Sequence, residues 1–270
     1  MSYWRYWNLN AAPFAEGDRD SFYRGQSVEE ALARIEFVCG QRRKLATLVA
    51  GSGVGKTRLL NYLVANPPRE SDAPQPRVIS MSMIGLQQGE LAERLASQLS
   101  GTRLPRRGHT WSILADCFAT SARSSGHTLL LVDDVESSSV EAEADLIRIV
   151  RAADDARLSV ILAIDAHLAS TVSRWLIERS YLQVELPAWD YHQTNHFLQY
   201  ALARCGRSEP LFTEAAVVRV QELSRGAARR IVQLADLALI GGAVSQAKWI
   251  DEQIILQVAQ ELPKSLSIAA

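Results

Sequence analysis

The chain has 270 residues, 47% of them apolar and 22% charged, so a sizeable core is expected and wholesale disorder is not. Lysine and arginine number 29 against 30 acidic residues. This balance gives no overall positive field that would hold DNA or an anionic membrane. The three cysteines lie far apart without metal-ligand spacing, which argues against a disulfide framework or a structural zinc site and favours a reducing compartment.

The N-terminal 14 residues contain no uninterrupted apolar run, so no signal peptide is expected. The most apolar stretches are far shorter than the roughly 20 residues that a membrane helix needs. We therefore expect a cytoplasmic protein without membrane insertion.

Elements are predicted in chain order from the spacing of apolar residues. Residues 1–26 are rich in aromatic side chains, which favours a strap packed on the body of the protein. A helix is predicted from Ser27, because Ser27 and Glu30 have the spacing of a capping box. Short apolar strands then alternate with helices, a pattern typical of a parallel sheet with helices on both faces. The predicted strands are 45–50, 77–83, 128–132, 158–164 and 182–186, and the predicted helices between them are 56–64, 90–99, 111–122, 141–152 and 168–177.

After Pro187 only helices are predicted. Asp190, Thr213 and Asp251 each have the character of a helix N-cap. A further helix over 227–240 is expected to stop at the glycine pair 241–242. We thus predict an N-terminal strap (1–26), an α/β domain (27–186) and a helical domain (187–265).

The segment from residue 50 to residue 57 reads AGSGVGKT and lies between a predicted strand and a predicted helix. It matches the phosphate-binding P-loop pattern, except that an alanine replaces the first glycine. Glycine lets backbone N–H groups curl around an anion, and the start of the next helix adds a positive dipole end. The alternative is a glycine turn that binds nothing. The predicted nucleotide-binding residues are Ala50, Gly51, Ser52, Gly53, Val54, Gly55, Lys56, Thr57 and Arg58.

Two acidic residues follow the apolar run 129–132. An acid at the end of such a strand is typical of a Walker B motif, so Asp133, together with Thr57, is expected to hold Mg²⁺. Asp134 stands where a glutamate normally orients or deprotonates the attacking water. Because aspartate is shorter, whether its carboxylate reaches that water is an open question at this point. Alternatively, both aspartates only cap the next loop. Glu136 could replace Asp134, although it lies beyond the strand end.

Several further motifs accompany the two Walker motifs: Trp7, Leu9, Pro13 and Phe14, the EAL of 30–32, the LFT of 211–213 with Ala216, and SRGAARRI at 224–231. Through these motifs and both Walker motifs, the chain resembles the AAA+ ATPases of the general secretion pathway protein A family, which are related to ATPases of bacterial transposition. The resemblance implies a P-loop α/β domain with a C-terminal helical lid, ATP and Mg²⁺ as cofactors, a homo-oligomer and a protein client.

The resemblance also implies roles for single residues. Arg229 would be the sensor 2 arginine, which touches the γ-phosphate, although Ala228 replaces the proline of that motif. Asp165 falls at the sensor 1 position; alternatively, it caps a helix or lies in a loop. Arg179, or else Arg174, would act on the nucleotide of the adjacent subunit; alternatively, Arg179 is a surface arginine in a salt bridge.

A basic loop offers a DNA contact. Arg103, Arg106 and Arg107 would line up with their copies in an oligomer and touch the phosphate backbone, or else form a solvated loop. The expected function is an ATPase that acts as a nucleotide-dependent oligomeric switch or remodelling factor, with slow hydrolysis. The alternatives are a DNA-binding assembly ATPase and a binding-only switch.

Overall fold

The computed structural model describes residues 2–15, 22–69, 75–101, 109–123, 126–152 and 157–262. Contacts between residues group the chain into two compact units. One comprises residues 1–25, 53–55 and 187–270, and the other comprises residues 26–52 and 56–186.

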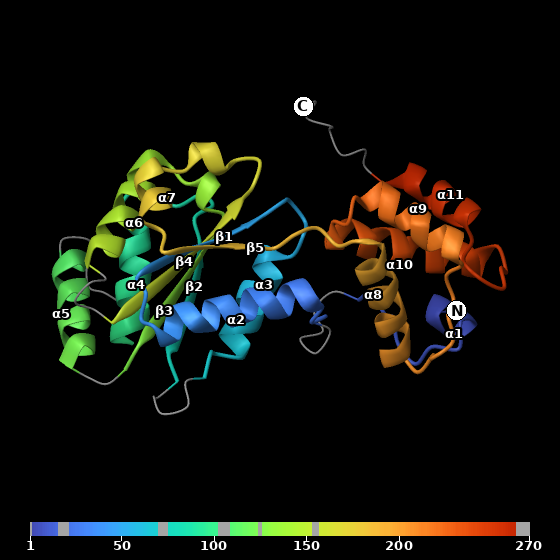
Figure 1. The fold of residues 1–270 in the computed structure, drawn as a ribbon, viewed down its shortest axis with the longest axis horizontal. Helices are drawn as coiled ribbons and strands as arrows, with labels where there is room; N and C mark the ends of the chain where they lie inside the picture. The colour runs from blue at the N-terminus through green and yellow to red at the C-terminus, as the bar shows by residue number, and fades with distance from the viewer. Residues whose placement is uncertain are drawn as a thin grey trace. The chain divides into compact units, whose positions relative to one another are not determined.

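A five-stranded sheet forms the centre of the unit that spans 26–52 and 56–186 (Figure 1). All its pairings are parallel, in the order β2-β3-β4-β1-β5. The carboxyl ends of its strands therefore meet at one edge, where the register aligns Ala50 with Asp165 and Ser82 with Asp133. The strands are β1 (Leu45–Ala50), β2 (Arg77–Ser82), β3 (Thr128–Asp133), β4 (Leu158–Asp165) and β5 (Leu182–Glu185).

Helices pack on the sheet because its central strands are apolar on both faces. In β3, Leu130 and Val132 belong to a buried cluster with residues of the helices that follow β2 and β3. The alternate residues of β3 point to the other face. The helices of this unit are α2 (Gln26–Gly40), α3 (Lys56–Ala65), α4 (Glu90–Ser100), α5 (Thr110–Arg123), α6 (Val140–Ala152) and α7 (Arg174–Arg179).

Two predicted features of this unit were wrong. Ser27 is buried inside α2, which already begins at Gln26, so it does not cap the helix. The helix predicted over 168–177 is a short 3₁₀ turn, Ala169–Thr171, followed by α7. The break occurs because Val172 is extended and the Ser173 side chain starts a new helix by accepting a hydrogen bond from the Trp175 N–H.

The other unit consists of helices with the N-terminal segment packed among them. Trp7 is buried, and its indole N–H donates to the carbonyl of Leu239 at 2.8 Å. The predicted caps Asp190, Thr213 and Asp251 are confirmed, because each side chain accepts a backbone N–H of the first helical turn. The helices are α1 (Tyr3–Tyr6), α8 (Tyr191–Arg204), α9 (Glu214–Ser224), α10 (Ala228–Val244) and α11 (Glu252–Glu261).

The predicted stop at Gly241 and Gly242 was also wrong, since α10 runs through both glycines to Val244. A Cβ on Gly242 would come within 2.6 Å of Ile250 Cδ1 and 2.8 Å of Trp7 Cζ2. This glycine therefore serves close packing of α10 rather than a turn. In the part of the chain that the structure describes, no helix has both the length and the apolar character needed to cross a membrane.

Candidate nucleotide-binding site

The loop between β1 and α3 has the backbone of an anion cradle. Gly53 and Gly55 have φ angles of 73° and 127°, which residues with a Cβ rarely adopt. Among the described residues, no backbone carbonyl accepts a hydrogen bond from the N–H groups of residues 51–55. With the N-terminus of α3 beside them, these donors suit a phosphate group.

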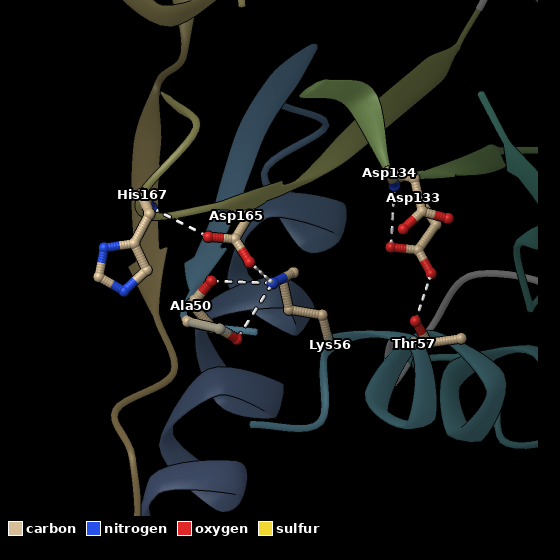
Figure 2. Close-up of polar contacts among 8 residues, drawn as sticks. Ala50, Lys56, Thr57, Asp133, Asp134, Asp165 and His167 are labelled. Carbon is tan, nitrogen blue, oxygen red and sulfur yellow. Dashed lines mark hydrogen bonds and ion pairs between the residues drawn. The ribbon is translucent and has the colours of Figure 1, made fainter. Parts of the chain in front are cut away.

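Lys56 begins α3, and its side chain turns back toward the end of β1 (Figure 2). The ammonium donates to the carbonyl oxygens of Ala50 at 2.8 Å and Gly51 at 3.2 Å. It also lies 3.6 Å from Oδ2 of Asp165, at the carboxyl end of β4. Asp165, which the resemblance puts at the sensor 1 position, is thus paired with the lysine of the P-loop.

Thr57 and Asp133 form the candidate metal site. The Thr57 hydroxyl donates to Oδ2 of Asp133 at 2.6 Å (Figure 2). Burial raises the pKa of the Asp133 carboxyl and the nearby Asp134 adds to this, whereas the Thr57 hydrogen bond and the Lys56 charge lower it. Among the described residues, no cluster of three His, Cys, Asp or Glu could hold a metal. One hydroxyl and one carboxylate instead suit a cation that takes its other oxygens from phosphate and water.

Asp134 follows β3 in a left-handed backbone conformation with φ of 54°. Its Oδ2 accepts a hydrogen bond from the Ser82 hydroxyl at 2.9 Å. Ser82 was not predicted as a site residue; its signal in the sequence is a polar residue at the end of β2, the strand next to β3. Glu136 lies in the 3₁₀ turn Val135–Ser137, and its Oε2 is buried without a hydrogen-bond partner among the described residues.

Arg174 and Arg179 both lie in α7, which precedes β5. Arg174 forms an exposed ion pair with Glu178 at 2.5 Å. The guanidinium of Arg179 instead lies 4.8 Å from the ring centre of Trp175, and the structure gives it no ion pair with a described residue. Because β1 and β5 are parallel, a residue just before β5 lies at the opposite end of these strands from the loop that follows β1.

Arg229 is exposed in the first turn of α10. Its backbone N–H donates to the carbonyl of Gly53 at 3.0 Å, and contacts group both residues in the same unit. Arg58 is exposed in the first turn of α3. The basic loop predicted to contact DNA lies outside the described residues.

Comparison with known proteins shows the class of this fold. Residues 39–172 match the family model described as AAA domain. The fold resembles the Holliday junction branch migration motor RuvB of Thermotoga maritima, with a TM-score of 0.60 and 16% identity over 93% of this chain and 74% of that one. It also resembles Cdc6p from Pyrobaculum aerophilum, with a TM-score of 0.72 and 15% identity over 94% and 72%.

A third similar structure is that of Drosophila ORC bound to DNA, with a TM-score of 0.69 and 18% identity over 97% of this chain and 65% of that one. Among curated proteins, none matches the sequence. Residues 39–172 therefore form an AAA domain, and the chain has the fold of an AAA+ P-loop ATPase, which confirms the predicted fold class. The narrower resemblance to the general secretion pathway protein A family stays a prediction.

Proposed function

We propose that this protein binds ATP with Mg²⁺ at the loop before α3 and acts as a nucleotide-dependent oligomeric switch or remodelling factor. The hydrogen bond between Thr57 and Asp133 carries this proposal. It holds a hydroxyl of the P-loop and a carboxylate of β3 close enough to share one small cation. Mg²⁺ prefers such oxygen ligands and keeps further positions for phosphate and water.

Each residue of the site has a proposed role. The ammonium of Lys56 would neutralise phosphate charge that backbone N–H groups alone leave uncompensated. Asp134, held by Ser82, would orient the attacking water. Arg229 would contact the γ-phosphate, and Arg179 would reach the nucleotide of a neighbouring copy of the chain.

Titration with a fluorescent ATP analogue tests nucleotide binding. Lys56→Ala should abolish tight binding, whereas Lys248→Ala, which removes an exposed lysine from the loop after α10, should bind as the wild type does. Undiminished affinity in Lys56→Ala would refute the P-loop assignment.

A second candidate is a switch that binds ATP with negligible turnover. The observation that favours it is the short carboxylate at position 134, which already has a hydrogen-bond partner in Ser82. Steady-state phosphate release separates the two functions. Measurable turnover that Asp134→Asn reduces would support the ATPase.

A third candidate is ATP-dependent assembly on DNA. It rests on the arginines at 103, 106 and 107 and on two of the similar structures, a Holliday junction motor and an ORC bound to DNA. Binding to duplex DNA that requires ATP and weakens steeply with salt would support it. Replacement of all three arginines by glutamine should then weaken that binding without changing ATP affinity.

A further inference from the structure

The ammonium of Lys56 is enclosed by oxygen atoms that belong to the protein itself. Two backbone carbonyls accept hydrogen bonds from it, and the carboxylate of Asp165 lies beside it as an ion-pair partner at 3.6 Å (Figure 2). Both partners of the ion pair are buried, with exposed fractions of 9% for Lys56 and 8% for Asp165. The charge proposed to meet phosphate is thus already matched by an internal anion.

Asp165 is held in this place by the sheet. Strand pairing sets it beside Ala50, and the N–H of Ala166 donates to the Ala50 carbonyl at 3.0 Å. Its own Oδ1 accepts the N–H of His167 at 2.9 Å, which leaves Oδ2 facing Lys56 (Figure 2). Strand pairing therefore places the backbone of Asp165, and the hydrogen bond from His167 orients its carboxylate toward Lys56.

The charges around Lys56 oppose the approach of a phosphate. A phosphate that approaches Lys56 must share or take over an ammonium already paired with Asp165, and the two negative groups repel each other at this distance. Because Lys56 and Asp165 are buried, water screens their charges poorly, which strengthens both the pairing with Lys56 and the repulsion between Asp165 and the phosphate. The carboxylate of Asp133 also acts electrostatically on Lys56, but its hydrogen bond goes to Thr57.

We propose that Asp165 is a built-in competitor of the nucleotide: its carboxylate takes the place of a phosphate at Lys56 and lowers the affinity for ATP and ADP. This inference rests on the proposed function and extends it. A residue at the sensor 1 position of the resembling family would contact the γ-phosphate of bound ATP. Here Asp165 acts on the nucleotide-free state and sets how readily nucleotide binds and leaves.

The test compares Asp165→Asn with the wild type by titration with ADP and with a non-hydrolysable ATP analogue. Asparagine keeps the shape and an oxygen that accepts the His167 N–H, but it removes the charge facing Lys56. We expect both nucleotides to bind about 10-fold more tightly, which corresponds to about 1.4 kcal/mol. Asp165→Ser keeps an acceptor for the same N–H and should shift affinity in the same direction, so it serves if the asparagine variant fails to fold.

Two controls separate charge from shape. Asp165→Glu keeps the negative charge and should not tighten binding, and Asp116→Asn removes an exposed charge from α5 and should leave affinity unchanged. A second readout is the temperature of thermal unfolding without nucleotide. Asp165→Asn should lower this temperature, because Lys56 loses its counter-charge.

Unchanged or weaker binding by a folded Asp165→Asn or Asp165→Ser would overturn the inference while leaving the proposed function intact. Equal tightening by Asp165→Glu would also overturn it. If neither the wild type nor the two neutral variants bind nucleotide, the proposed function and this inference both fail.

Discussion

The carboxylate of Asp134 is one methylene shorter than the glutamate that normally orients water at this place, and the Ser82 hydroxyl holds it. Asp134→Asn keeps its shape and the bond to Ser82 but removes the basic oxygen. We therefore expect ATP affinity within twofold of the wild type and a phosphate release rate lower by about 10²-fold.

Asp134→Glu is the matched variant, because it restores the longer reach and should not fall below the wild-type rate. Hydrolysis by Asp134→Asn at the wild-type rate would show that Asp134 is not the base.

The surroundings of His127 predict how the stability of the folded protein depends on pH. Burial, with the charges of Arg42 and Arg157, lowers its pKa from 6.5 to about 4. Its Nε2 pairs with the Ser159 hydroxyl, which donates its own proton to the Arg43 carbonyl, and its Nδ1 has no partner among the described residues. The folded protein therefore keeps this imidazole neutral.

Because the unfolded chain takes up this proton first, the contribution of His127 is fully present above about pH 6.5 and is lost as the pH falls toward 4. The full loss amounts to roughly 3 kcal/mol. Urea unfolding at pH 7 and pH 4.5 should show a smaller difference for His127→Asn than for the wild type. An equal difference in the two proteins would show that another group causes the acid sensitivity.

At the scale of elements, we predict that a side chain at position 242 of α10 destabilises the protein. Alanine there would press its Cβ against Ile250 Cδ1 and Trp7 Cζ2, at 2.6 and 2.8 Å. Overpacking of this kind should lower the free energy of unfolding by about 1–3 kcal/mol, despite the better helix propensity of alanine.

Gly241→Ala is the internal control for this prediction. Its Cβ would lie 3.2 Å from Val258 Cγ1, a milder contact that the gain in helix propensity should offset. If urea unfolding shows the two variants to be equally stable, close packing is not the reason for Gly242.

Local patterns predicted the elements where sequence and packing agree. The predicted bounds of β1 match the structure, and the caps of α8, α9 and α11 were read from single polar residues. The prediction failed where tertiary contacts override local rules. A glycine pair is typical of a helix stop, and only the contacts with Ile250 and with Trp7, which is distant in sequence, reveal that Gly242 serves packing.

The candidate site was predicted to a similar degree. The P-loop and the two aspartates of β3 form contiguous motifs, so their residues could be read directly. The hydrogen bond between Ser82 and Asp134 and the ion pair between Lys56 and Asp165 could not be predicted, because they depend on strand order and register. Ser82 and Asp165 each stand at the end of a strand, and this position is the one signal of these contacts that the sequence offers.

At the scale of the whole molecule, the position of Arg179 leads us to predict that ATPase activity depends on contact between copies of the chain. Trp175 holds its guanidinium, and the arginine lies at the opposite end of β1 and β5 from the P-loop. A guanidinium supplied from a neighbour contributes roughly 10³–10⁵ in rate where such fingers operate. Specific ATPase activity should therefore rise with protein concentration.

Mixing experiments make this prediction sharper. Arg179→Ala and Lys56→Ala should each be inactive, yet a mixture should recover part of the activity, because some interfaces pair an intact P-loop with an intact arginine. Arg174→Ala, which removes an arginine paired with Glu178, is the matched control and should stay active. Activity that is independent of concentration and no recovery on mixing would leave Arg179 as a surface residue.

The central claim is that ATP bound at the P-loop controls assembly, and the mass of the protein in solution tests it most directly. Mass should be measured with and without Mg²⁺ and a non-hydrolysable ATP analogue, for the wild type and for Lys56→Ala. The account predicts that the analogue shifts the wild type from 29.8 kDa to a multiple of that mass, and that Lys56→Ala does not shift. A wild type that binds the analogue and keeps the mass of a single chain would contradict it.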